Sequence, residues 1–261
     1  MMVNRILFFT IHRSGSMFTH RVCRDLTRLC NMTYYSPNGG DVPVSVREMA
    51  QNAAFWHGKR GCFGPLRIFM DVPDREHDQV ILHLRDPRDV LISMYYSYCY
   101  SHPGEIPGFT GYRRDIAERG IDDFVLKLAT SKTRPVIGDY GTGAHLWDLT
   151  GNVLQRYQLY VSRLLNDPKV LLVTYEEMVT DLAGWLEKVL DAFDIEDREK
   201  VLLRLIEYYQ SDLWPPRENE WSHKRHVIPG DYKNRLSRET VEKLNHIFAD
   251  VLQCLGYQDI E

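Results

Sequence analysis

The sequence has little of what marks a secreted, membrane-spanning or metal-stabilised protein. Its five cysteines are odd in number and show no CxxC pair or zinc-finger spacing, which favours reduced thiols in a cytoplasm over a disulfide framework. The apolar run Ile6–Phe9 has four residues, too few for the core of a signal peptide or for a membrane span. We therefore expect a cytoplasmic protein with no membrane span.

A large excess of charge of one sign is also missing. The formal net charge of −4 argues against broad nucleic-acid binding, although a local basic pocket could still hold a small anion. With 44% hydrophobic and 26% charged residues, the composition is that of an ordinary globular protein. A chain of 261 residues can bury a core without disulfide or metal staples, and we interpret it as one domain over residues 1–261.

Short apolar runs bounded by polar residues predict buried strands, and apolar residues at helical spacing predict helices between them. The strands are expected at Arg5–Thr10, Leu66–Met70, Gln79–Leu84 and Lys169–Thr174, and the helices at 16–30, from Pro87 onward, and at 121–129, 152–165, 176–193, 198–209 and 241–255. Such alternation predicts an α/β fold of three layers, with a central, mostly parallel sheet flanked by helices. An irregular insertion at about 97–145 and a covering loop at about 211–235 interrupt the pattern.

Capping residues mark where two of these helices begin. Asp86 and Pro87 suit the N-cap and first turn of a helix, and Ser237 suits the N-cap of the last one. We expect Arg88 to be a solvated first-turn residue. The buried side of the helix after Pro87 is predicted to carry Val90, Leu91, Met94 and Tyr95.

The first strand runs into a helix through the stretch TIHRSGSMF, residues 10–18. A strand that enters a helix through a glycine turn aims backbone N–H groups and the positive helix end at one point, where an anion can bind. Ser14 and Ser16 add hydroxyl groups, and Arg13 adds a permanent cation with forked donors. The competing interpretation is that Gly15 only permits the turn while Arg13 is solvated.

An ATP-binding loop of the form GxxxxGK[ST] is absent, since no glycine lies five residues before Gly15 and no lysine follows it. An anionic group shorter than a triphosphate fits this loop better. The turn after the third predicted strand supplies a second cation, Arg85, and Ser93 follows eight residues later, about two helical turns on. These two side chains could bind a second phosphate.

Four segments in order, TIHRSGSMF, LRDPRDVLISMYY, VTYEEM and RHVIPGDYKN, resemble the signature segments of the sulfotransferases that use 3′-phosphoadenosine 5′-phosphosulfate (PAPS). The resemblance implies a P-loop-like sulfotransferase fold and in-line transfer of a sulfuryl group from PAPS. The product nucleotide would be 3′-phosphoadenosine 5′-phosphate (PAP), and no metal would be required. The acceptor would be a hydroxyl or amine of a small molecule, a lipid or a carbohydrate.

The same resemblance assigns roles to residues of this chain. The first loop would hold the 5′-phosphosulfate, the second turn the 3′-phosphate, and a tyrosine would lie near the adenine, with a ring of the first loop stacked on it. A late loop would close over the nucleotide, although Val227 stands where the family has glycine. The residues concerned are Arg13, Ser14, Gly15, Ser16, Met17 and Phe18 of the first loop, Arg85 and Ser93, Tyr175, and Arg225 and His226 of the late loop.

Catalysis would need a group on the leaving oxygen and a base for the acceptor proton. Arg13 stands where the family has its catalytic lysine and can hydrogen-bond the bridging oxygen. The segment Cys62–Arg67 lacks the histidine that many family members carry there, so His57 and Asp71 are the candidate bases. The competing interpretations are a surface or structural histidine and a helix-capping aspartate, and His83, inside a strand, is expected in the core or supporting the site.

Two other functions remain open from the sequence. The chain could be an ATP-dependent small-molecule kinase, against which the missing lysine counts, or a nucleotide-binding protein that lost its base. The acceptor cannot be read from the residues, since segments 34–65 and 97–145 match the family least. A homodimer is compatible with the sequence.

Overall fold

The computed structural model describes residues 5–101, 109–131, 151–213 and 227–257. The chain divides into two compact units. The first comprises Met1–Arg85 and Ser162–Ser211, and the second comprises Asp86–Val161 and Asp212–Glu261. The interpretation of residues 1–261 as a single domain stays a prediction.

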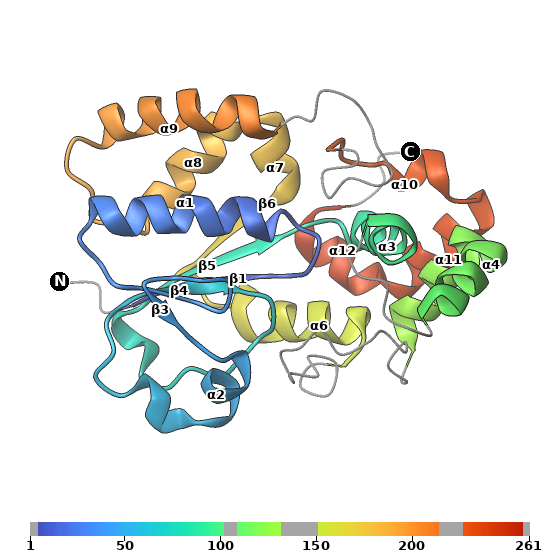
Figure 1. Ribbon diagram of the computed structural model, residues 1–261, viewed down its shortest axis with the longest axis horizontal. Coiled ribbons are helices and arrows are strands. Elements are labelled where there is room, and N and C mark those ends of the chain that lie inside the picture. The colour runs from blue at the N-terminus through green and yellow to red at the C-terminus, as the bar shows by residue number, and fades with distance from the viewer. Residues whose placement is uncertain (1–4, 102–108, 132–150, 214–226, 258–261) are drawn as a thin grey trace. The chain divides into compact units, whose positions relative to one another are not determined.

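A six-stranded sheet forms the centre of the first unit (Figure 1). Its strands are β1 (Arg5–Thr10), β2 (Tyr34–Ser36), β3 (Val42–Pro43), β4 (Gly61–Leu66), β5 (Gln79–Leu84) and β6 (Val170–Thr174). They lie in the order β3-β2-β4-β1-β5-β6, and every neighbouring pair is parallel. Their carboxyl ends therefore meet at one edge, called the carboxyl edge, and the prediction of an α/β fold with a central parallel sheet is confirmed.

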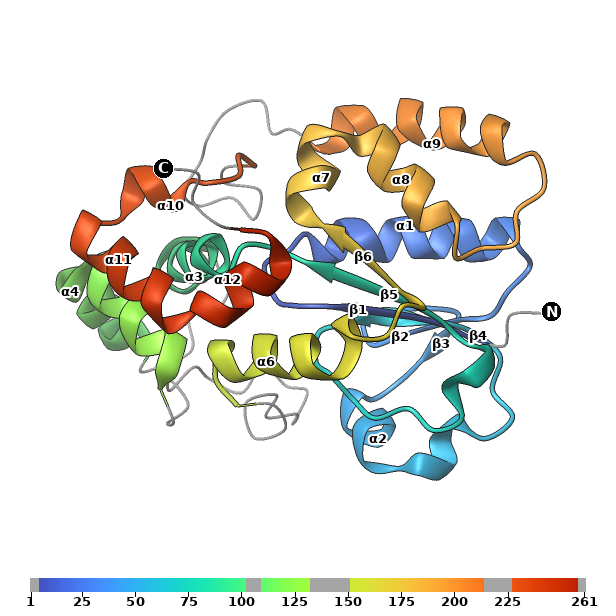
Figure 2. The same ribbon diagram turned by 180° about the vertical axis from the view of Figure 1, so that it is seen from behind.

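Helices of the first unit cover both faces of this sheet (Figures 1 and 2). One face carries α1 (Ser16–Leu29), α7 (Tyr175–Thr180), α8 (Leu182–Leu190) and α9 (Arg198–Leu213), and the other carries α2 (Val46–Gln51) and the 3₁₀ helix η1 (Ala53–Trp56). The short 3₁₀ helix η2 (Arg75–His77) precedes β5. The single helix expected over 176–193 is two, because Asp181 caps α8 by accepting the Gly184 N–H at 3.0 Å.

The second predicted strand is wrong in position: it is expected at Leu66–Met70, but β4 covers Gly61–Leu66. This strand was not recognised in the sequence because it contains two glycines, and glycine usually weakens a strand. Here both glycines let the chain approach a neighbour closely. A Cβ at Gly61 would lie 2.3 Å from the Thr33 carbonyl oxygen, and one at Gly64 would lie 2.7 Å from that of Phe8.

The described part of the second unit is helical. Its elements are α3 (Pro87–Tyr96), the π-helical turn η3 (Ser97–Ser101), α4 (Phe109–Thr130), α6 (Val153–Tyr160), α10 (Tyr232–Arg235), α11 (Arg238–Ile247) and α12 (Ala249–Leu255). A second π-helical turn, η4 (Val161–Leu165), follows α6 and lies almost entirely in the first unit. Asp86 caps α3, and the four side chains predicted on its inner side are buried, as expected. Ser237 caps α11, and Gly256, with φ 72°, ends α12.

Arg88 corrects a further expectation, because it is 2% exposed rather than solvated. Its Nε and Nη2 donate to both carboxylate oxygens of Asp86 at 2.7–3.2 Å. It also donates to Asn245 Oδ1 at 2.7 Å and to the Tyr257 carbonyl at 3.1 Å. The helix start therefore holds the carboxyl-terminal helices of its own unit through one buried guanidinium.

Candidate functional site in the first unit

The loop between β1 and α1 has the backbone of an anion-binding turn. Arg13 has φ 68° and Gly15 has φ 77°, whereas Ser14 between them is not in the positive-φ region. Alternating handedness of this kind turns consecutive N–H groups toward one side of the chain. A positive φ at a non-glycine residue costs on the order of 1 kcal/mol, so the strain at Arg13 marks a position that the surrounding structure holds in place.

Gly15 is required at the start of α1 for two reasons. Its carbonyl accepts the N–H groups of Phe18 and Thr19 at 2.8 and 3.1 Å, which begins the helix while its own φ stays positive. A Cβ at this position would lie 2.9 Å from Met178 Cε and 3.4 Å from the ring of Tyr175. Glycine therefore lets α7 approach the loop closely.

The hydroxyl of Ser14 serves the loop itself. Ser14 is fully buried, and its Oγ donates to the Ile11 carbonyl at 2.6 Å. Since its single proton is used there, it accepts from Thr10 Oγ1 at 2.7 Å. These bonds give the hydroxyl a structural use within the loop, and the phosphate contact that the sequence suggests stays a prediction.

Arg85 follows directly on β5, and its side chain reaches the loop. Its Nη1 donates to the Arg13 carbonyl at 3.0 Å, across 72 residues of sequence. Its guanidinium carbon lies 4.1 Å from the ring centroid of Tyr175, the first residue of α7, in a cation–π contact. The structure therefore brings Arg13, Arg85 and Tyr175 together at the carboxyl edge, as the four segments predict.

Arg67 also lies at this edge, and the sequence analysis missed it. Its Nε donates to Ser16 Oγ at 3.0 Å and its Nη2 to Met17 Sδ at 3.4 Å, at the first turn of α1. Among the described residues no carboxylate pairs with Arg67, which is half-buried. Burial lowers the pKa of its guanidinium, which nevertheless stays charged. Arg67 could have been found because it comes directly after a strand. It was missed because that strand was predicted over Leu66–Met70, which places Arg67 inside it.

Comparison with known proteins gives the family. Residues 74–256, most of the chain, match the model of the family described as the sulfotransferase domain. The chain belongs to this sulfotransferase family. No curated protein matches the sequence.

Two solved structures share the fold of this sulfotransferase. Mouse sulfotransferase SULT7A1, complexed with PAP, is 13% identical with a TM-score of 0.60, over 98% of this chain and 90% of its own. Retinol dehydratase, in a complex with retinol and PAP, is 14% identical with a TM-score of 0.51, over 100% of this chain and 84% of its own.

Phe18 of the sulfotransferase lies deep in the packing of α1. Its ring is 6% exposed and meets Tyr209 edge-on at 5.1 Å and Trp185 at 6.1 Å between centroids. Such burial leaves little of the ring for stacking on an adenine, whereas Met17 beside it is 55% exposed. The expected role of Phe18 as the adenine platform stays a prediction, and the contacts it makes are those of a core residue.

The two candidate bases are not joined to this loop. His57 is exposed and precedes β4, whose first residue pairs with Arg5 at the amino edge of the sheet; the neighbouring Trp56 lies 5.9 Å from the Arg5 guanidinium. Asp71, also exposed, comes two residues before Pro73, whose carbonyl accepts from Arg5 at 2.7 Å. Within the described residues, no hydrogen bond or ion pair links either side chain to residues 11–16.

Other predicted residues lie in the second unit. Ser93 is half-buried on α3. On the same helix, Asp89 accepts the N–H groups of Gly230 and Tyr232 at 2.7 and 3.0 Å and so fixes the end of the late loop. Arg225 and His226 lie outside the described residues.

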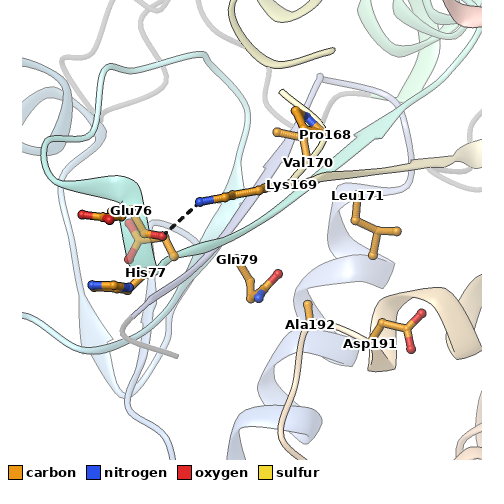
Figure 3. A pocket seen from close by; sticks show the side chains of 10 residues that line it. Glu76, His77, Gln79, Pro168, Lys169, Val170, Leu171, Asp191 and Ala192 are labelled. Carbon is orange, nitrogen blue, oxygen red and sulfur yellow. Dashed lines mark hydrogen bonds between the residues drawn. The ribbon is translucent and has the colours of Figure 1, made fainter. Parts of the chain in front are cut away.

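A pocket of about 520 Å³ lies at the amino edge of β5 and β6, opposite the carboxyl edge (Figure 3). Lys169 reaches across it, and its Nζ lies 3.5 Å from the Glu76 carbonyl (Figure 3). His77, Gln79 and Asp191 complete a lining of mixed charge. Parallel sheets of this class bind ligands at the carboxyl ends of their strands. This pocket lies at the amino ends and is therefore separate from the candidate site.

Metal and membrane features are also absent from the described residues. None of their helices is long and apolar enough to cross a membrane. Nor do they contain three or more His, Cys, Asp or Glu side chains grouped to hold a metal ion.

Proposed function

We propose that this sulfotransferase uses PAPS as donor and transfers its sulfuryl group to a hydroxyl or amine of a small molecule, a lipid or a carbohydrate. The observation that carries the proposal is the clustering of Arg13, Arg85 and Arg67 around the loop at the carboxyl edge. The PAP bound in two solved proteins of the same fold supports it. The guanidinium groups of Arg85 and Arg67 contact a turn of alternating handedness that itself carries Arg13, and this concentration of cations suits a nucleotide with anionic groups at both its 3′ and 5′ positions.

Each end of the donor would meet a different part of this cluster. The N–H groups of Gly15 and Ser16, together with Arg13 and Arg67, take the 5′-phosphosulfate. Arg85 takes the 3′-phosphate, because five N–H donors allow it to bind the Arg13 carbonyl and a phosphate together. Tyr175 lies beside Arg85 and faces the nucleotide base, while the matching role of Ser93 stays a prediction from the motif.

Transfer would proceed by in-line displacement. The acceptor oxygen or nitrogen forms a bond to sulfur as the bond from sulfur to the bridging oxygen breaks, and PAP leaves with the electron pair. Arg13 donates to that oxygen as negative charge builds on it. The acceptor proton goes to a base, and His57 and Asp71 stay the residues that the sequence offers for this role, although neither side chain is bonded to the loop.

A small-molecule acceptor is the class we favour. Retinol dehydratase, with the same fold, is in a complex with retinol and PAP, which supports a small hydroxyl-bearing acceptor here. Lipid and carbohydrate acceptors are then tested in the same assay.

The proposal predicts a preference among nucleotides. PAP at about 100 times its Kd should stabilise the protein by about 2.7 kcal/mol and raise its melting temperature, whereas ATP at the same concentration should do so much less. Equal shifts for PAP and ATP would contradict the two-phosphate site, and magnesium-dependent ATP hydrolysis would favour a kinase.

Activity is tested with sulfur-35-labelled PAPS and a panel of phenols, alcohols, amines and sugars. Arg13→Ala should lower transfer by 100-fold or more, since it removes a charged donor to the leaving oxygen. Arg28→Ala is the matched control, because Arg28 is exposed at the far end of α1. Failure of every acceptor with a PAP-binding protein would indicate a nucleotide-binding protein without transferase activity.

A further inference from the structure

Two carbonyl groups of the loop accept hydrogen bonds from side chains at the end of β5 and directly after it. The Ser14 carbonyl accepts from His83 Nε2 at 2.8 Å, and the Arg13 carbonyl accepts from Arg85 Nη1 at 3.0 Å. A trans peptide group is planar, with its C=O and N–H pointing in opposite directions. The N–H of Gly15 must therefore point away from His83.

A hydrogen bond from Trp185 fixes which nitrogen of His83 donates. The indole Nε1–H of Trp185 lies 3.2 Å from His83 Nδ1, and an indole N–H can only donate. Nδ1 is therefore the acceptor, and Nε2 carries the proton that goes to the Ser14 carbonyl. The ring is fully buried, with Trp185 perpendicular to it at 5.6 Å, so it cannot turn over without repacking α8.

The charge state of His83 suits this use. Burial lowers its pKa to about 4, although the hydrogen bond to Ser14 and the charge of Glu177 act in the opposite direction. A neutral ring adds no positive charge beneath the loop and keeps a lone pair for Trp185. A leucine or valine, usual in a buried strand such as QVILHL, would leave the Ser14 carbonyl without its donor.

We propose that His83 is a positioning residue of the donor site, which holds the Ser14 carbonyl inward and thereby aims the Gly15 N–H at the 5′-phosphate end of the nucleotide. The inference rests on the proposed function, because it needs a nucleotide at this loop. His83 itself does not touch the donor. It acts through one peptide group, and Trp185 acts through His83.

The test compares two ligands that differ only at the 5′ position. PAP carries a 5′-phosphate and adenosine 3′-monophosphate does not, and calorimetry gives the Kd of each. His83→Leu should weaken PAP about tenfold while leaving adenosine 3′-monophosphate within about twofold. His83→Gln, which keeps an N–H donor, should recover most of the PAP affinity.

Leu82→Ala is the matched control, because Leu82 is a fully buried neighbour on β5. This variant should be less stable, but the ratio of the Kd values of the two ligands should not change. Equal weakening of both ligands by His83→Leu, or no change in either, would overturn the proposal. If wild-type protein binds neither ligand, the proposed function itself fails.

A second measurement applies even if His83→Leu does not fold. In wild-type protein labelled with nitrogen-15, the imidazole shifts at neutral pH should show a protonated Nε2 and an unprotonated Nδ1, both with and without PAP. Trp185→Phe should loosen this preference and weaken PAP more than adenosine 3′-monophosphate. The opposite tautomer in the wild type would overturn the proposal.

Discussion

Acidification should destabilise this protein through His83. Its pKa in the folded chain is about 4, against an ordinary value of 6.5, mainly because burial disfavours the charged ring. Between these two values the unfolded chain binds more protons than the folded one. The free energy of unfolding therefore falls as the pH drops from 6.5 toward 4.

The size of the effect follows from the two pKa values. Each pKa unit corresponds to about 1.36 kcal/mol. Once His83 is fully protonated in the unfolded chain, the free energy of unfolding is therefore lower by about 3.4 kcal/mol. Between pH 7 and pH 5 the loss from His83 is roughly 2 kcal/mol. That is a large share of a typical unfolding free energy of about 5–15 kcal/mol.

Urea unfolding at pH 7 and pH 5 measures this loss, and His83→Gln isolates it, because glutamine keeps the donor to Ser14 but does not titrate. Wild-type protein should lose roughly 2 kcal/mol more than the variant. His20, whose pKa burial also lowers, acts in both proteins and cancels in the difference. Equal losses in the two proteins, or an NMR titration of His83 near 6.5, would refute the reasoning.

Three further substitutions test the loop and its supports. Gly15→Ala should cost at least about 2 kcal/mol in urea unfolding, through its positive φ and the contact of a Cβ with Met178, whereas Gly39→Ala, with φ 93° and open space, should cost less. Arg67→Met should slow sulfuryl transfer at least tenfold at nearly unchanged melting temperature, and normal turnover would remove it from the site. Asp89→Asn weakens the acceptor of two backbone N–H groups and should cost about 1–3 kcal/mol in urea unfolding.

Much of the fold could be predicted because its signals are local. β1 and β5 are mostly apolar, as is usual for a strand that is buried on both faces. The helix starts at Asp86 and Ser237 carry capping residues whose side chains do accept backbone N–H groups. The strands Tyr34–Ser36 and Val42–Pro43 were missed, because two or three residues show no periodicity.

Part of the candidate site could also be predicted from the sequence, and part of it could not. Arg13 and Arg85 could be named from the sequence because each lies in the turn after a strand, and the carboxyl ends of parallel strands share one edge. Tyr175 was named through the family resemblance of the segment VTYEEM. The candidate bases could not be placed, because the direction of β4 decides at which edge His57 lies.

By itself, the sequence determined the α/β class, the glycine turn and the cations at the strand ends, since these depend on residue type and on neighbours a few positions away. Only the tertiary structure decided what those groups do. The bonds from Arg67 to Ser16, from His83 to Ser14 and from Arg85 to Arg13 span 51 to 72 residues. Such contacts depend on the register and order of the strands, which no local pattern of residues encodes.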